Sequence, residues 1–166
     1  DSPTDATAHR DELLGALAGR PDIRRMARNP VMLTALAVVH WNEHRLPEQR
    51  ADLYDSIIRW LSRSREQRKD RLPADRTVAL LGELALAMHD HPKGRQVQVP
   101  KRWAAEAIAP EIEPGTRKRV SVTRHTIERA EKFLDEEEND SGIVVKRGNE
   151  IRFWHLSFQE FLAAKA

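Results

Sequence analysis

Apolar residues recur at helical spacing through the first third of the chain. Leu13, Leu14 and Leu17 predict a helix over residues 6–17, and Pro21 opens a short second helix. Residues 30–41 predict a third helix, apolar nearly all round and therefore expected to be buried on most sides. A fourth amphipathic stripe follows, ending near residue 64. This pattern predicts an all-α bundle.

The order of elements changes after residues 65–71, a charged run that we interpret as a solvated linker. The pattern then predicts a helix over 73–89, a strand over 96–99, and helices over 101–109 and 123–138. A β-hairpin is predicted over 143–154, with its turn at residues 147–149, where Gly148 stands. This is the order of a winged helix. We therefore predict a mainly α chain with a helical domain over residues 1–68 and a winged-helix domain with a small β-hairpin sheet over residues 72–166.

The last stretch changes from strand to helix. The helix is predicted to begin at Ser157, whose hydroxyl would cap it while Glu160 reaches back, as in an S-x-x-E capping box. Phe158, Phe161 and Leu162 would form its apolar face. His155 lies at the joint between the two elements.

Composition narrows the class of protein. Charged residues are 33% and hydrophobic residues 40%, as in globular domains, and no run approaches the roughly 20 apolar residues of a membrane span. The chain has no cysteine, which excludes thiolate metal sites and favours a reducing, cytoplasmic location. The formal charge of +2 does not by itself imply a nucleic-acid partner.

Glycine usage excludes a phosphate-binding loop. None of the seven glycines stands in G-x-x-x-x-G-K-[ST] or G-x-G-x-x-G. The chain therefore lacks the phosphate cradle of a P-loop enzyme, and we do not expect it to hydrolyse a nucleotide on its own.

Residues 40–44 spell H-x-x-E-H, an inverted zincin pattern. Helical spacing would place His40 and His44 on one face, with Glu43 beside them as a base. However, Pro47 follows closely and no third ligand is indicated. The preferred interpretation is a polar helix C-terminus, where histidine is favourable against the helix dipole. No metal site is predicted here, nor at His89-Asp90-His91.

A winged helix raises the possibility of DNA binding through its third helix. That helix, residues 123–138, carries six acidic residues against three basic ones. Such a surface repels phosphate, which dominates the affinity of DNA-binding modules. An interaction-type winged helix is favoured, and a DNA-binding transcriptional regulator is the alternative, supported by a small basic patch at residues 117–119 and Arg124.

Three stretches, in order, resemble one family. Residues 27–37 resemble A-R-N-P-L-L-L-T-x-L-A, residues 46–54 resemble L-P-x-x-R-x-x-L-Y, and residues 153–164 resemble F-x-H-x-S-F-Q-E-F-L-A-A. These are motifs of the post-ATPase half of NACHT-type STAND NTPases, a class that includes animal NOD-like receptors and bacterial antiphage proteins. The resemblance spans nearly the whole chain.

The resemblance implies a regulatory module that follows a nucleotide-binding domain. ADP or ATP, with Mg²⁺, would be bound mainly by that domain, while Pro30 would pack near the adenine. His155 would donate a hydrogen bond to the β-phosphate of ADP and so hold a closed, inactive state. Apart from the resemblance, Pro30 is explained as the first residue of a helix capped by Asn29, and His155 could simply end the strand and cap the helix of Ser157. ATP exchange and a sensed ligand would open the module and allow homo-oligomerisation. The chain would then be a piece of a longer ATPase, with antiphage defence as the expected setting.

Overall fold

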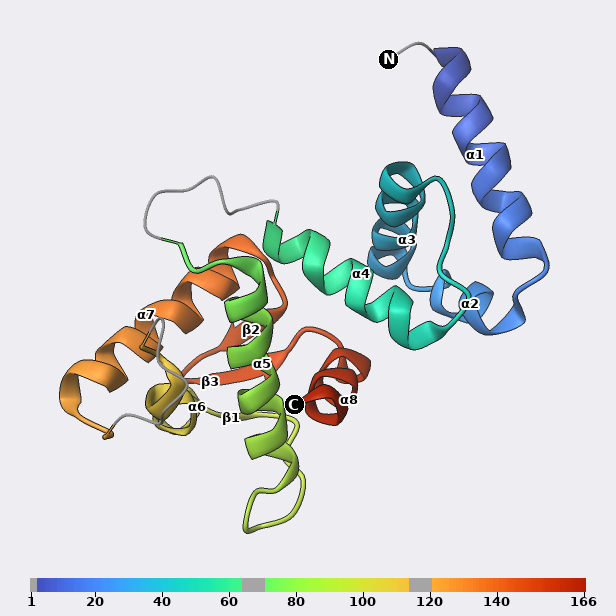
Figure 1. Cartoon of the computed structure of the whole chain (residues 1–166). Coiled ribbons are helices and arrows are strands. Elements are labelled where there is room, and N and C mark those ends of the chain that lie inside the picture. Colours follow the sequence, from blue (N-terminus) through green and yellow to red (C-terminus); the bar gives the residue numbers. More distant parts are fainter. Residues whose placement is uncertain (1–2, 64–70, 114–120) are drawn as a thin grey trace. The chain divides into compact units, whose positions relative to one another are not determined.

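The computed structural model describes residues 3–63, 71–113 and 121–166 of the 166-residue chain. Its backbone forms two compact units, Asp1–Trp60 and Leu61–Ala166 (Figure 1). Helices dominate both, and three short strands form one small sheet, so the predicted mainly α class is confirmed. The division predicted between residues 68 and 72 stays a prediction, because residues 64–70 lie outside the described residues.

Three of the four helices that the structure describes in the first unit begin at a proline. Its helices are α1 (Pro3–Ala18), α2 (Pro21–Met26), α3 (Pro30–Glu43) and α4 (Arg50–Arg63), the last of which crosses into the second unit. Pro21 and Pro30 are each the first helical residue, where a missing N–H breaks no helical hydrogen bond.

The burial of α3 is narrower than predicted. Met32, Leu36 and Val39 are at most 2% exposed and form one stripe, whereas Leu33 is 40% and Trp41 is 46% exposed. The expectation that α3 is buried on most sides is therefore wrong. A single stripe at three- and four-residue spacing is enough to attach this helix to its neighbours.

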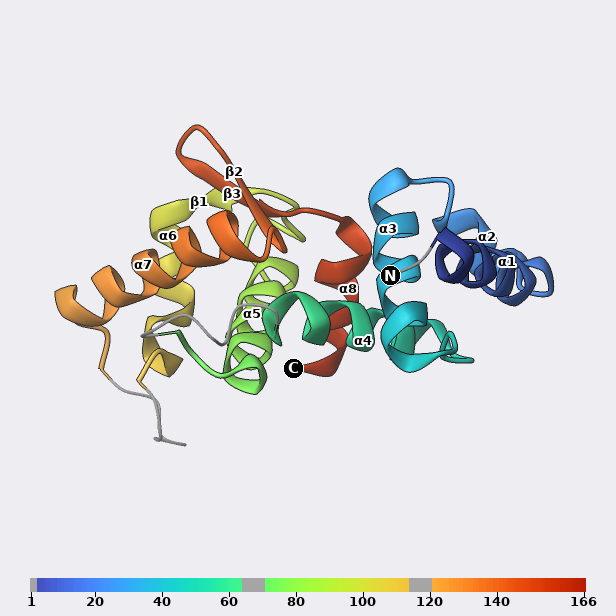
Figure 2. The same ribbon diagram turned by 90° about the horizontal axis from the view of Figure 1, so that it is seen from above.

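The second unit has the order of a winged helix, as predicted. Its elements are α5 (Ala74–His89), β1 (Val99–Pro100), α6 (Lys101–Ile108), a 3₁₀ turn η1 (Ala109–Glu111), α7 (Arg124–Asp140), β2 (Val144–Arg147), β3 (Glu150–Phe153) and α8 (Leu156–Lys165). The antiparallel sheet has the order β1-β3-β2. The hairpin projects beyond α6 and α7 (Figure 2). Gly148 opens its two-residue turn at φ 64°, which favours glycine.

The first strand is shorter and later than predicted. Only Val99 and Pro100 pair with β3, whereas the prediction covered residues 96–99. The backbone of Gln96 has other partners: its N–H donates to Met88 O, and its carbonyl accepts from the Gln159 side chain. These bonds attach the segment to α5 and α8, so it does not join the sheet.

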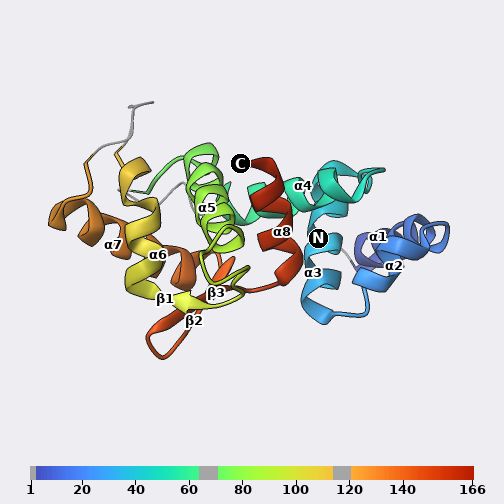
Figure 3. The ribbon, with the colours of Figure 1, turned by 90° about the horizontal axis from the view of Figure 1, so that it is seen from below.

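Helix α5 lies between α8 on one side and α6 on the other (Figures 1 and 3). Leu80, Leu81 and Leu84 of α5 are at most 1% exposed, as are Phe158 and Leu162 of α8. The hydrophobic core of the unit is therefore centred on α5, which packs against α8 on one side and α6 on the other.

A buried ionic cluster joins the segment before α5 to the C-terminal half of α7. The Arg71 guanidinium, 9% exposed, lies 2.8 Å from Glu136, 2.9 Å from Glu137 and 3.3 Å from Asp140. Ser141 Oγ donates to Glu137 Oε2 at 2.7 Å. The prediction that the run 65–71 is solvated is therefore wrong at Arg71, because three carboxylates from α7 surround its side chain.

Among the residues that the structure describes, no helix is both long enough and apolar enough to cross a lipid bilayer.

We expect Arg71→Ala to lower the free energy of unfolding by about 3–5 kcal/mol, because it leaves buried carboxylates without their cation. Urea unfolding measures this loss. Arg95→Ala is the matched control, since the Arg95–Glu160 pair is 39% and 51% exposed and such pairs contribute about 1 kcal/mol or less. Equal losses in the two variants would show that the Arg71 cluster carries no special weight.

Glu137 makes stability depend on pH. Burial raises the pKa of Glu137 above its ordinary value of 4.5, and the hydrogen bond from Ser141 and the charge of Arg71 offset this only in part. The folded protein therefore binds the proton more tightly than the unfolded chain. The resulting stability is fully present below the unfolded pKa and is lost as pH rises through the raised folded pKa.

Accordingly, Glu137→Gln should gain stability relative to the parent as pH rises from about 4 to about 7. Urea unfolding of both proteins across this range tests the sign. A Glu137→Gln difference that stays constant, or that moves the other way, contradicts the assignment.

Candidate functional site

His155 lies between β3 and α8, and its backbone is held on both sides. The N–H of the preceding Trp154 donates to Ile143 O at 2.8 Å, which extends the hairpin by one bond. The carbonyl of His155 accepts from Phe158 N at 3.0 Å, which begins α8. The residue itself is half-buried. Its position is therefore determined by both the sheet and the helix.

The side chain of His155 caps α8. Its Nδ1 accepts from the backbone N–H of Ser157 at 3.2 Å, with the His155 backbone in an extended conformation. This satisfies one of the N–H groups that a helix N-terminus leaves unpaired. The predicted cap at Ser157 is wrong: α8 begins at Leu156, and Glu160 pairs with Arg95 at 2.6 Å instead of reaching back.

The cap also determines which nitrogen of His155 can donate. A nitrogen that accepts a hydrogen bond carries no proton, so the neutral ring has its hydrogen on Nε2. The half-buried imidazole thus offers one N–H donor in a direction set by α8. This donor is suited to an anionic oxygen such as that of a phosphate or carboxylate.

Pro30 is exposed at the first position of α3. Asn29 precedes it as the predicted N-cap: its Oδ1 accepts from Met32 N at 3.5 Å, and its carbonyl accepts from Leu33 N at 2.9 Å. Pro30 belongs to the first unit and His155 to the second. The structure therefore gives the surroundings of each predicted site residue separately, within its own unit.

The second family-like stretch is anchored through Arg20. Its guanidinium donates to the backbone carbonyls of Leu46, Pro47 and Glu48, in the loop that precedes α4. These hydrogen bonds fix the position of the loop, which has no helix or strand of its own. Arg20 was not singled out in the sequence, because its partners are more than 25 residues away.

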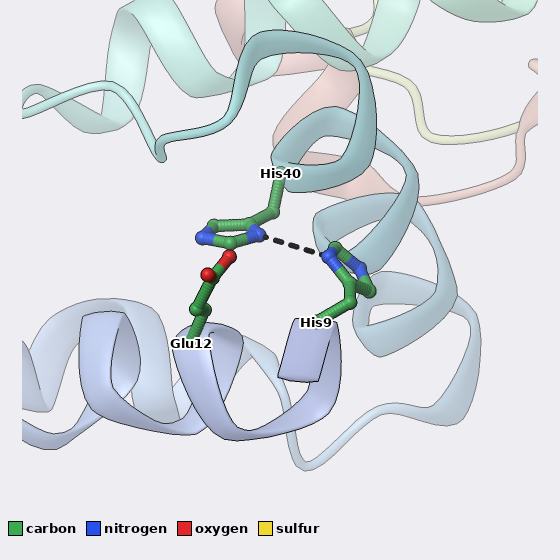
Figure 4. Close-up of side chains that lie close together, drawn as sticks. All are labelled: His9, Glu12 and His40. Atoms are coloured by element: carbon green, nitrogen blue, oxygen red, sulfur yellow. Dashed lines mark hydrogen bonds between the residues drawn. The ribbon is translucent and has the colours of Figure 1, made fainter. Parts of the chain in front are cut away.

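The H-x-x-E-H pattern does not form a site. Helix α3 ends at Glu43, and His44 has a left-handed backbone with φ 54°, so the helical spacing between His40 and His44 is broken. His40 instead faces His9 of α1, with Glu12 nearby (Figure 4). Burial, and then the neighbouring His9, lower the pKa of His40, while Glu12 acts in the opposite direction.

His9 and Glu12 were not predicted from the sequence as site residues. Their three-residue spacing places both on one face of α1, which is a signal of a shared partner. The partner, His40, is 31 residues away from His9 on a different helix. No local pattern joins the two, so only the packing of α1 on α3 reveals the group.

The basic residues of α7 face acidic ones. The pairs are Arg124 with Glu128 at 2.8 Å, Arg129 with Glu113 at 2.5 Å, and Lys132 with Glu136 at 3.6 Å. A helix with surplus acid, whose cations already face carboxylates, is a poor surface for nucleic-acid phosphates. The basic patch at residues 117–119 lies outside the described residues, and the DNA-binding alternative stays a prediction.

Comparison with known proteins identifies one family. The family model described as the winged helix-turn-helix domain C-terminal to NACHT matches residues 32–166, which include most of α3, all of α4 and the whole second unit. Helices α1 and α2 precede the match. A search of curated proteins gave no match, and neither did a search of solved structures.

The capping role of His155 predicts a difference between two substitutions. His155→Ala should lower the free energy of unfolding by about 1 kcal/mol, because Ser157 N–H loses its acceptor. His155→Asp should stay within about 0.5 kcal/mol of the parent, since a carboxylate caps helices well and favours the positive end of the dipole. Chemical denaturation of the three proteins measures both values. A loss in the aspartate variant as large as in the alanine variant would contradict the cap.

Proposed function

Because the chain belongs to the family of winged helix-turn-helix domains that lie C-terminal to NACHT, we propose that it is the regulatory module of a nucleotide-switched NACHT ATPase. In this proposal it contacts ADP bound to the NACHT domain in cis and stabilises a closed state. Exchange for ATP and the sensing of a ligand release the contact and permit oligomerisation. The resemblance to bacterial antiphage proteins extends the proposal to that setting.

The hydrogen bond from Ser157 to His155 carries the proposal. It commits Nδ1 as an acceptor and leaves Nε2 as the donor, which is the group that a phosphate oxygen requires. The nucleotide, when bound to the NACHT domain, supplies the anionic phosphate, and Mg²⁺ and the hydrolytic machinery belong to that domain. His155 contributes one N–H donor, Nε2, whose direction is set by the junction between β3 and α8.

Pro30 is the proposed contact to the adenine. Its exposed ring offers a small apolar surface, and the Asn29 cap holds the helix start that carries it. Pro30 belongs to the first unit and His155 to the second, and the two contacts are proposed separately.

The proposal predicts that the capping and nucleotide roles of His155 separate in the parent protein that carries the NACHT domain. His155→Asp keeps the cap but places a negative charge where the donor stood. His155→Ala loses both. Both variants should bind ADP about tenfold or more weakly, since a hydrogen bond to a charged group contributes about 1.5–3 kcal/mol. Competition with a fluorescent ADP analogue measures affinity, and light scattering measures oligomeric state.

The stability measurement provides the control. If ADP affinity falls only in His155→Ala, it follows the lost cap, and the effect is structural. If His155→Asp binds ADP as the parent does and remains monomeric at the same nucleotide concentration, the proposed contact is wrong. Weakened ADP binding in the well-folded aspartate variant supports it.

A further inference from the structure

Three metal-ligating side chains converge in the first unit, and none of them is a residue of the proposed function. His9 and Glu12 come from α1 and His40 from α3 (Figure 4). One nitrogen or oxygen of each lies within 4.8 Å of the corresponding atoms of the other two. The Glu12 carboxylate points toward the His40 ring, and the two imidazoles present nitrogen atoms to each other.

The distance between the histidines suits a shared ion. His9 Nδ1 and His40 Nδ1 are 3.4 Å apart, which is longer than the usual 2.7–3.2 Å of a hydrogen bond to nitrogen. Two nitrogens bound to a tetrahedral zinc at about 2.0–2.1 Å lie about 3.3–3.4 Å from each other. The two rings are tilted by 48°, so they do not stack, and their Nδ1 atoms are the ring atoms that approach each other.

The surroundings favour a defined site. His40 is 4% exposed, whereas His9 is half-buried and Glu12 is exposed, so the group is fixed on one side and reachable from solvent on the other. The rings of Trp41 and His9 pack in a T-shaped arrangement, with centroids 4.7 Å apart and planes at 84°, which restrains the orientation of His9. Two imidazoles and a carboxylate form a donor set that zinc accepts, with a fourth position left for water.

We propose that His9, Glu12 and His40 bind one divalent transition-metal ion of the zinc class, and that this ion ties α1 to α3. Among the described residues of α1, the buried apolar side chains are Leu13 and Leu17. Two leucines are a small apolar contact for a helix of 16 residues. An ion held by both helices adds a contact in the middle of α1, on the N-terminal side of these leucines.

The test uses the chain without an affinity tag, first freed of metal with EDTA. Titration with zinc chloride in a calorimeter should show one saturable equivalent, and Co²⁺ should give the visible absorption of a tetrahedral nitrogen and oxygen site. Zinc should also raise the melting temperature, since an ion that binds only the folded state stabilises it.

The variants are chosen to remain folded. His9→Ala and Glu12→Gln change accessible ligands, whereas His40 is buried and its loss would disturb packing. His9→Ala should weaken zinc binding about tenfold or more and abolish the rise in melting temperature. Glu12→Gln should weaken binding with little change in the stability of the metal-free protein. His44→Ala, a change outside the cluster, should bind zinc as the parent does.

Absence of saturable zinc binding, or equal binding by the parent and His9→Ala, would overturn the proposal and leave the His9–His40 contact as a hydrogen bond between imidazoles. Loss of binding in His44→Ala with retention in His9→Ala would also overturn it, because the ligands would then be those of the H-x-x-E-H pattern.

Discussion

The packing of α8 on α5 determines the position of His155. Phe158 and Leu162 of α8 are almost completely buried, and Gln159 donates to the carbonyl of Gln96 at 2.7 Å. The two helices approach closely at Gly82, where an added Cβ would lie 3.4 Å from the Ala166 Cβ. Since β3 holds the chain on the other side, His155 moves only with the unit that carries it. Its orientation is a property of the fold, not of a free side chain.

Much of the fold could be predicted from local signals. Pro21 and Pro30 marked helix starts because proline restricts the backbone and lacks an N–H, and Gly148 marked the hairpin because its turn requires a positive φ. The start of α8 was predicted too late, with Ser157 instead of His155 as the preferred cap. Serine is a far commoner N-cap than histidine, but Arg95, 65 residues away, takes Glu160, and the imidazole supplies the cap.

Clusters formed by residues far apart in the sequence could not be predicted from local sequence patterns. Arg71 stands in a run of charges that is typical of a solvated linker, yet three carboxylates of α7 bury it. The grouping of His9 with His40 likewise depends on how α1 packs on α3. In both cases the sequence contains the right chemical groups. The packing of separate helices supplies the juxtaposition, and periodicity within one helix carries no information about it.

The distribution of charge explains why a single donor suits the proposed switch. A diffuse positive surface attracts phosphate over about 10 Å at moderate ionic strength, so it weakens gradually as two bodies separate. A hydrogen bond depends steeply on distance and angle, and a displacement of about 1 Å is enough to break it. The α7 cations lie against acidic residues, whereas the His155 cap directs one N–H. A contact of this kind is either made or lost, which is the response that a two-state regulator requires.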